Sequence, residues 1–157
     1  MNMIEATRDD AEIVGNVHSL AWKQAYKDIF PTEYIVADTS VKRKQEILEA
    51  LDTDSCKYYL VYEKDCCAGV VKVILNNSMC EISSIYFLQE FRNKGLGTEV
   101  ITQLKEIYKD YRMVLWTLEI NTSARKFYEK NGFVVTANRR SIHRGKEFVQ
   151  VQYEFKK

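Results

Sequence analysis

A chain of 157 residues has the length of one domain, and we expect a single domain over residues 1–157. Its formal net charge of +1 argues against nucleic-acid binding driven by bulk charge, and no apolar run approaches the ~20 residues of a membrane span. The N-terminus lacks the basic-then-apolar pattern of a signal peptide, so we expect a cytoplasmic protein with neither nucleic-acid nor membrane partners.

The first part of the chain predicts one short strand and two helices. The strand covers about 3–6, and Thr7 to Asp10 then resembles a capping box. Behind it, apolar residues recur at helical spacing: Ile13, Val17 and Leu20. The chain breaks near Pro31. A second helix over about 40–51 is expected to turn four residues inward: Val41, Ile47, Leu48 and Leu51.

From residue 57 the pattern changes to short β-branched and aromatic runs separated by turn residues. These runs predict an antiparallel meander over Tyr58–Tyr62, Ala68–Leu75 and Met79–Phe87. The remainder predicts a helix at 97–111, a strand at 113–119, a helix at 122–130 and strands from 133 and over 148–155. This order describes an α/β fold with a mixed sheet and helices on both faces.

The four cysteines show no C-x-x-C spacing: Cys56, Cys66, Cys67 and Cys80. The adjacent pair, Cys66 and Cys67, has the softness to bind a metal, but free thiols in a reducing compartment fit the spacing better. We therefore expect no metal site.

The most informative stretch is a glycine loop between the third meander strand and a helix: Arg92, Asn93, Lys94, Gly95, Leu96, Gly97 and Thr98. Glycines allow successive backbone N–H groups to approach an anion closely. The following helix adds its unsatisfied N–H groups and the positive end of its dipole. With the charges of Arg92 and Lys94, the loop predicts a diphosphate site, although a flexible surface turn has the same composition.

Two other phosphate loops fit less well. A P-loop places Lys directly after its last glycine, whereas here Thr98 follows Gly97. A dinucleotide fingerprint gains support from Glu119, which ends the next strand as a ribose-binding acid does. However, its third glycine position holds Val100, and Gly95 lies eight residues (95 − 87) past Phe87. A dinucleotide-binding oxidoreductase is therefore an alternative.

The loop resembles the phosphate loop of the GCN5-related N-acetyltransferase (GNAT) family, [Q/R]-x-x-G-x-[G/A], in its bacterial form. Residues 85–90, IYFLQE, are similar to the family's I-Y-V-x-P-E lead-in, with Gln89 in place of a common proline. Residues 121–133, NTSARKFYEKNGF, are similar to its N-x-x-A-x-x-F-Y-x-x-x-G-F motif. The expected element order matches the family fold over nearly the whole chain.

The resemblance implies a mostly antiparallel sheet in which one parallel pair of strands splays apart around acetyl-coenzyme A. Three residues would pair with the pantetheine arm through their backbone: Ile85, Tyr86 and Phe87. The loop would hold the diphosphate, and Asn121 and Tyr128 would complete the cofactor site. Asn121 also fits the cap of the helix that carries Tyr128, and Gly132 fits the left-handed position that ends it.

The family's chemistry implies direct attack of an amine on the thioester within a ternary complex. Tyr128 would be the general acid for the coenzyme A thiolate, and the Ile85 N–H would stabilise the oxyanion. The base is open: Glu81 lies where some members carry a catalytic glutamate, Glu119 is equally possible, and many members use water. A sheet-face role for Glu81 is the plainer interpretation.

The acceptor wall of the family corresponds to the segment with Trp22, Tyr26 and Tyr34, and Glu119 is a candidate anchor for a cationic acceptor. Packing is an alternative role for the three aromatic residues, and His18 and His143 are expected to be structural or exposed. The acceptor itself, a small-molecule or protein amine, is not specified. A homodimer is possible, and a non-catalytic acetyl-coenzyme A sensor is a second hypothesis.

Overall fold

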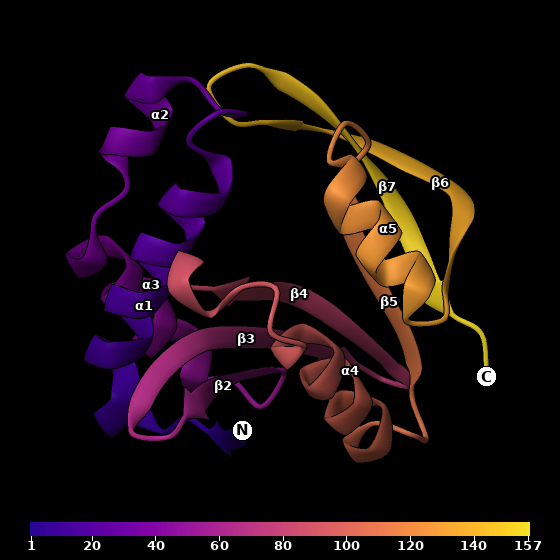
Figure 1. The fold of residues 1–157 in the computed structure, drawn as a ribbon, viewed down its shortest axis with the longest axis horizontal. Helices are drawn as coiled ribbons and strands as arrows, with labels where there is room; N and C mark the ends of the chain where they lie inside the picture. The colour runs from indigo at the N-terminus through magenta and orange to yellow at the C-terminus, as the bar shows by residue number, and fades with distance from the viewer.

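A seven-stranded mixed sheet forms the centre of the computed structural model, which describes all residues 1–157 (Figure 1). In chain order the strands are β1 Asn2–Glu5, β2 Cys56–Glu63, β3 Cys66–Asn76, β4 Met79–Phe87, β5 Arg112–Leu118, β6 Phe133–His143 and β7 Glu147–Phe155. The helices are α1 Ala11–Tyr26, α2 Thr32–Ala37, α3 Ser40–Leu51, α4 Leu96–Ile107 and α5 Thr122–Lys130. Two 3₁₀ turns, η1 Arg8–Asp10 and η2 Gln89–Phe91, precede α1 and α4. The predicted α/β fold with helices on both faces is confirmed.

The strand order β1-β2-β3-β4-β5-β7-β6 is antiparallel except between β4 and β5. This parallel pair is short: it runs from Met79 opposite Arg112 to Ile82 opposite Leu115. Beyond these residues β4 stays paired with β3, and β5 stays paired with β7. The two strands therefore diverge, as Figure 1 shows, and the predicted splayed parallel pair is confirmed.

A β-bulge lies on β4 where the splay begins. Lys72 is opposite Ser84, but the next residue of β3 is opposite Ile82, so Ser83 is the extra residue. A bulge bends its strand and redirects the neighbouring side chains. It therefore turns the end of β4 away from β5.

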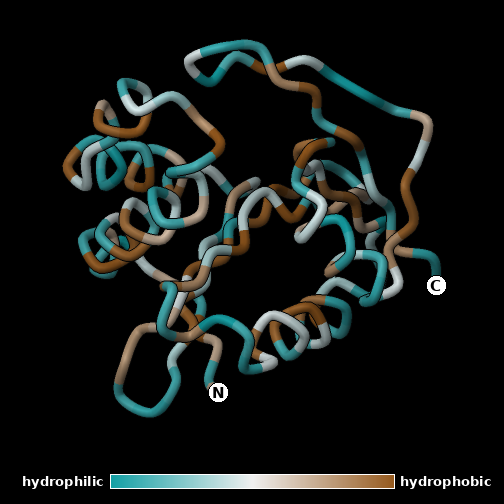
Figure 2. The backbone as a smooth tube through the Cα atoms, turned by 45° about the horizontal axis from the view of Figure 1, so that its top comes forward, coloured by the Kyte–Doolittle hydropathy of each residue, from teal (hydrophilic) through white to brown (hydrophobic).

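Of three apolar cores, two cover the two faces of the sheet and a smaller one surrounds Trp22 and Phe30. One lies under α1 and α3: Ala6, Ala11, Val14, Val17, Ile47, Cys56, Tyr58, Leu60 and Val70. The larger lies under α4 and includes the predicted helix face: Val100, Ile101, Leu104 and Tyr108. Hydrophobic and hydrophilic residues alternate along strands and helices (Figure 2), as layers with one buried side require.

Four details of the sequence prediction are wrong. The helix expected over 97–111 ends at Ile107. Leu20 is 50% exposed, because α1 turns a different face inward, and Val41, in the first turn of α3, is 77% exposed. Helices α1 and α3 touch at Gly15, where a Cβ would lie 3.1 Å from the Lys44 backbone nitrogen. Helix α2 was not predicted, since six residues are too few to show helical periodicity. The capping interaction does form, with the Thr7 N–H donating to Asp10 Oδ2 at 2.8 Å.

Candidate active site

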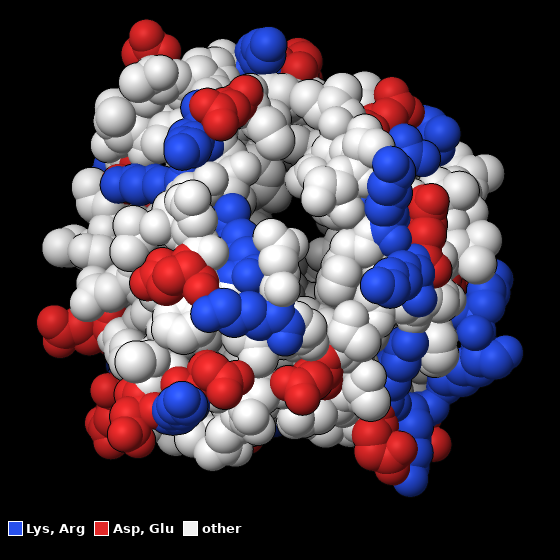
Figure 3. Space-filling model, in the orientation of Figure 1, with Lys and Arg blue, Asp and Glu red and all other residues white.

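A cleft of about 670 Å³ lies where β4 and β5 diverge, on the side of α4 and α5. Figure 3 shows this face hollowed near its middle, with Lys and Arg side chains on both sides of the hollow. The cleft brings together all predicted cofactor-binding residues except Lys94: Ile85, Tyr86, Phe87, Arg92, Asn93, Gly95, Leu96, Gly97, Thr98, Asn121 and Tyr128.

The glycine loop presents unpaired backbone amides to this cleft. The Arg92 N–H donates to Gln89 O and the Glu99 N–H to Gly95 O, but no N–H from 93 to 98 has a partner within the protein. Asn93 (φ 60°) and Gly95 (φ 81°) are left-handed, which turns consecutive amides in one direction. The loop leads directly into the N-terminus of α4, whose dipole favours an anion. The geometry fits a diphosphate.

Gly97 allows α5 to approach the loop closely. A Cβ at this position would lie 2.8 Å from the Phe127 ring, well inside van der Waals contact. Asn121 Oδ1 accepts from the Ala124 N–H at 3.1 Å and caps α5, and Gly132 is left-handed (φ 90°) beyond its end. Both predicted helix ends are confirmed, so packing and capping fix Tyr128 beside the loop.

The two predicted cationic residues of the loop do different things. Arg92 Nε donates to Phe87 O at 3.0 Å, and its Nη2 donates to Ala21 O at 3.4 Å. The guanidinium therefore ties the end of β4 to α1 at the edge of the cleft. Lys94 is exposed, with Nζ 5.7 Å from the centre of the Phe91 ring, and it does not line the cleft.

The free edge of β4 offers hydrogen-bond donors to the gap. The Leu88 N–H donates to Ala68 O on β3 at 2.8 Å. Because successive N–H groups of a strand alternate between its two edges, the N–H groups of Ile85 and Phe87 face away from β3. They point into the space that β5 has vacated, where an extended ligand can pair as an added strand.

Tyr86 and Tyr128 line the inner end of the cleft, and Tyr26 lies next to them. Tyr26 Oη lies 3.5 Å from Tyr86 Oη, and the two rings meet edge to face at 6.0 Å. Burial raises the pKa of Tyr128 well above its usual value, and the nearby Tyr26 raises it further. Burial likewise raises the pKa of Tyr26 and of Tyr86. All three phenols are therefore protonated at neutral pH and can donate hydrogen bonds.

A second cavity of about 470 Å³ lies on the opposite side of the sheet, between α1, α2, α3 and the β6–β7 end. The predicted acceptor residues Trp22, Tyr26 and Tyr34 line it, together with the bulge residue Ser83. Tyr86 lines both this cavity and the cofactor cleft. The two cavities therefore approach each other through the gap between the splayed strands.

The two candidate carboxylates lie outside both cavities. Glu81 is opposite Val114, in the part of the β4–β5 pair that stays closed. Glu119 has a side chain that is 45% exposed and lies 3.4 Å from Arg139 Nε. The structure therefore brings together the loop, the strand edge and Tyr128, but neither glutamate.

Sequence reasoning did not assign His18 and Lys72 to the site, although both line the second cavity. His18 is 4% exposed, and its Nδ1 has no hydrogen-bond partner. Burial, and then the charges of Arg43 and Lys72, lower the pKa of His18 to about 3. Lys72 carried one signal: it is the lone charged residue in an otherwise apolar run.

No group of three or more His, Cys, Asp and Glu side chains is placed to hold a metal ion. Cys66 is exposed, and Cys67 is half-buried with its Sγ 3.7 Å from Gly69 O. No helix is both long enough and apolar enough to cross a membrane.

A mixed sheet with one splayed parallel pair above a glycine loop and a helix N-terminus defines the N-acyltransferase class of folds. Residues 16–133 match the model of the acetyltransferase (GNAT) family, and the chain belongs to this family.

Streptothricin acetyltransferase A of Bacillus subtilis (strain 168) is 32% identical over 83 residues, which are 50% of this chain and 48% of that protein. The chain spans about half the length of the curated relatives it matches. PaiA N-acetyltransferase from Thermoplasma acidophilum, solved with coenzyme A, has a TM-score of 0.79 at 20% identity, covering 99% of this chain and 100% of that one.

A GNAT family acetyltransferase from Elizabethkingia anophelis with acetyl-CoA bound has a TM-score of 0.59 at 23% identity. The match covers 73% of this chain and 83% of that one. At these identities the two structures are alike in fold.

Proposed function

We propose that this protein is an acetyl-coenzyme A-dependent N-acetyltransferase that acetylates a primary amine by direct attack within a ternary complex. One observation carries the proposal: two cavities on opposite sides of the sheet approach each other at Tyr86, in the gap between β4 and β5. A donor in one cavity and an acceptor in the other can therefore meet without a covalent enzyme intermediate. The bound coenzymes of the two similar structures support the assignment of the donor.

The cleft residues divide the binding of acetyl-coenzyme A between them. The amides of 93–98 hold the diphosphate, and the N–H groups of Ile85 and Phe87 pair with the pantetheine arm. The arm takes the place of a strand beside β4, which satisfies amides that otherwise face only solvent. Arg92 positions the loop by its bonds to Phe87 and Ala21.

At the reacting end, the Ile85 N–H donates to the thioester oxygen as negative charge develops there. One preorganised donor of this kind contributes roughly 3–4 kcal/mol to transition-state stabilisation. Tyr128 donates its hydroxyl proton toward the sulfur of the departing thiolate. A free thiol has a pKa of about 8.5, below that of this buried phenol, so Tyr128 assists an already fair leaving group.

The acceptor amine must lose a proton before it attacks, because a free alkyl amine has a pKa near 10. His18 has a pKa of about 3 and is too weak a base for this step. Glu81 and Glu119 lie outside both cavities. Asp38 and Glu46 line the second cavity but are paired with Arg43, so we assign the proton to water in that cavity.

The test is coenzyme A release from acetyl-coenzyme A with purified protein and a panel of amines that includes streptothricin, small amines and peptides. We expect turnover with at least one acceptor and a much slower rate in Tyr128→Phe. Tight coenzyme A binding without turnover of any amine would instead favour the sensor hypothesis. Family membership removes the dinucleotide-binding oxidoreductase from consideration.

A further inference from the structure

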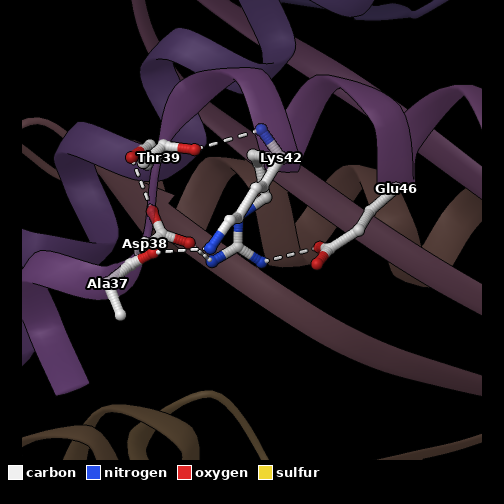
Figure 4. A network of polar contacts seen from close by, with 7 residues as sticks. Ala37, Asp38, Thr39, Lys42 and Glu46 are labelled. Carbon is white, nitrogen blue, oxygen red and sulfur yellow. Dashed lines mark hydrogen bonds and ion pairs between the residues drawn. The ribbon is translucent and has the colours of Figure 1, made fainter.

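The second cavity has two carboxylates, and both are already paired. Asp38 accepts from Arg43 Nη2 at 2.7 Å and from Ser19 Oγ at 2.6 Å. Glu46 accepts from Arg43 Nη1 at 3.4 Å, and Figure 4 shows Asp38 and Glu46 in one polar network. The side chains of Asp38 and Arg43 are only 14% and 18% exposed, so this pair is part of the cavity wall. Arg43 offsets only one of these two negative charges, but five cationic side chains line the cavity against two carboxylates, so its lining has a net charge of +3.

Four cationic side chains that line the same cavity have no acidic partner: Lys42, Lys72, Arg140 and Arg144. Lys72 comes from the middle of β3, and its Nζ lies 5.6 Å from the centre of the Tyr58 ring. Arg144 follows β6, and its Nη1 donates to the carbonyl of His143 at 2.8 Å. Each retains donors that no protein anion satisfies.

Arg140 completes this set from β6. Its Nε donates to Gln150 Oε1 at 2.7 Å, and its guanidinium lies 4.3 Å from the centre of the Trp116 ring. A fourth cation, Lys42, lies at the edge and donates to the carbonyl of Ala37 at 3.4 Å. The cations come from opposite walls of the cavity. Lys42 and Lys72 lie on α3 and β3, whereas Arg140 lies on β6, on the other side of the β4–β5 gap in the strand order.

The positive charge lies close to the reacting end. Lys72 is opposite Ser84, one residue past the bulge, and Ser84 also lines the cavity. The buried His18 stays neutral beside it because burial and the neighbouring cations lower its pKa. An anion near Lys72 therefore meets ammonium and guanidinium donors beside an uncharged imidazole.

We infer that the acceptor is a small amine that also carries an anionic group, a carboxylate or a phosphate, held by Lys72 and Arg144 while its amine reaches the gap at Tyr86. The inference rests on the proposed function, because it names the acceptor of the same site. A bare polyamine would bring further positive charge to a cavity whose lining is already net positive. An amino acid or an amino phosphate would neutralise the unpaired cations instead.

The test compares acceptors in matched pairs that differ only in the anionic group. L-phenylalanine is set against phenethylamine, L-lysine against cadaverine, and phosphoethanolamine against ethanolamine. We expect kcat/KM to be at least 10-fold higher for the anionic member, either in the two carboxylate pairs or in the phosphate pair. The pair that shows the preference identifies the anionic group as a carboxylate or a phosphate. The same amines are added to the coenzyme A-bound protein in thermal unfolding, where only anionic members should raise Tm, whether or not they react.

Two variants test the assigned cations, and one serves as their control. Lys72→Gln and Arg144→Gln should each raise KM for the preferred anionic acceptor at least 10-fold and leave KM for the matched amine without the anionic group within 3-fold. Lys109→Gln removes a lysine whose side chain is 66% exposed and that lines neither cavity, so it should leave both unchanged. Because Lys72 is in a central strand, Arg144→Gln keeps the test open if Lys72→Gln fails to fold.

The inference would be overturned if, in all pairs, the amine without the anionic group were preferred both in rate and in thermal shift. The inference would also be overturned if Lys72→Gln and Arg144→Gln both folded and both kept the wild-type preference for the anionic member. Failure of the proposed function would be visible separately, because no amine of any pair would then release coenzyme A from acetyl-coenzyme A, whether or not coenzyme A binds.

Discussion

Replacing His18 with glutamine should remove a specific dependence of stability on pH. The imidazole is 4% exposed, and its pKa of about 3 in the folded protein compares with 6.5 for an unperturbed histidine. Between these values the unfolded chain binds the proton and the folded protein does not. The contribution of His18 to stability is therefore complete above pH 6.5 and is lost as the pH falls toward 3.

The magnitude follows from the size of this shift. Each pH unit below 6.5 costs about 1.4 kcal/mol of unfolding free energy until the pH nears the folded-state pKa. Between pH 7 and pH 5 this residue should thus cost the wild type about 2 kcal/mol. In His18→Gln that part of the loss disappears, since the amide does not titrate.

The assay is urea unfolding of wild type and variant at pH 7 and pH 5. The other histidine provides a matched control: His143 is exposed, so His143→Gln should retain the wild-type loss. Equal losses of unfolding free energy in wild type and His18→Gln would refute the reasoning, because they would mean that His18 is protonated in the folded protein or exposed to solvent.

Three further predictions concern catalysis and the loop. Tyr128→Phe should lower kcat by about 10–1000-fold, with coenzyme A affinity by calorimetry within about 3-fold of wild type; an unchanged kcat would contradict the role of Tyr128 as proton donor. Gly97→Ala places a Cβ 2.8 Å from the Phe127 ring, so it should lower the free energy of unfolding in urea by about 1–3 kcal/mol and raise KM for acetyl-coenzyme A. A wild-type free energy of unfolding together with a wild-type KM would count against the tight contact. Glu81→Gln and Glu119→Gln should keep kcat within about 3-fold of wild type in steady-state assays, and a loss beyond about 100-fold in either would identify that carboxylate as the base.

The parts of the fold that sequence predicted best are those in which one local signal decides the structure. Asn121 and Gly132 bracket α5 with a cap and a left-handed residue, and both ends form as expected. The α4 face was equally readable, because Val100 and Leu104 lie on one uninterrupted apolar stripe. Leu20 was misassigned because the inward face of α1 depends on where α3 touches Gly15, which is a tertiary contact.

The cofactor loop was predictable because it is contiguous in sequence, whereas only the aromatic residues of the second cavity were predicted, from the family resemblance. Lys72, Arg144 and Asp38 come from three distant segments, and only the fold brings them to one cavity. The charge of Arg92 predicted a contact with phosphate, but its guanidinium donates to backbone carbonyls of β4 and α1. The partners that decide such roles are far apart in sequence and leave no local pattern.

Cofactor binding in this protein depends on the unpaired amides of residues 93–98, which hold the diphosphate of coenzyme A in the proposed complex. Calorimetric titration compares coenzyme A with pantetheine, which has the thiol arm but lacks the diphosphate and the adenosine 3′-phosphate attached to it. A separate titration with adenosine 3′-phosphate measures the contribution of that last part. We predict that coenzyme A binds at least 100-fold more tightly than pantetheine. Equal affinities, or no heat from coenzyme A at all, would contradict the account.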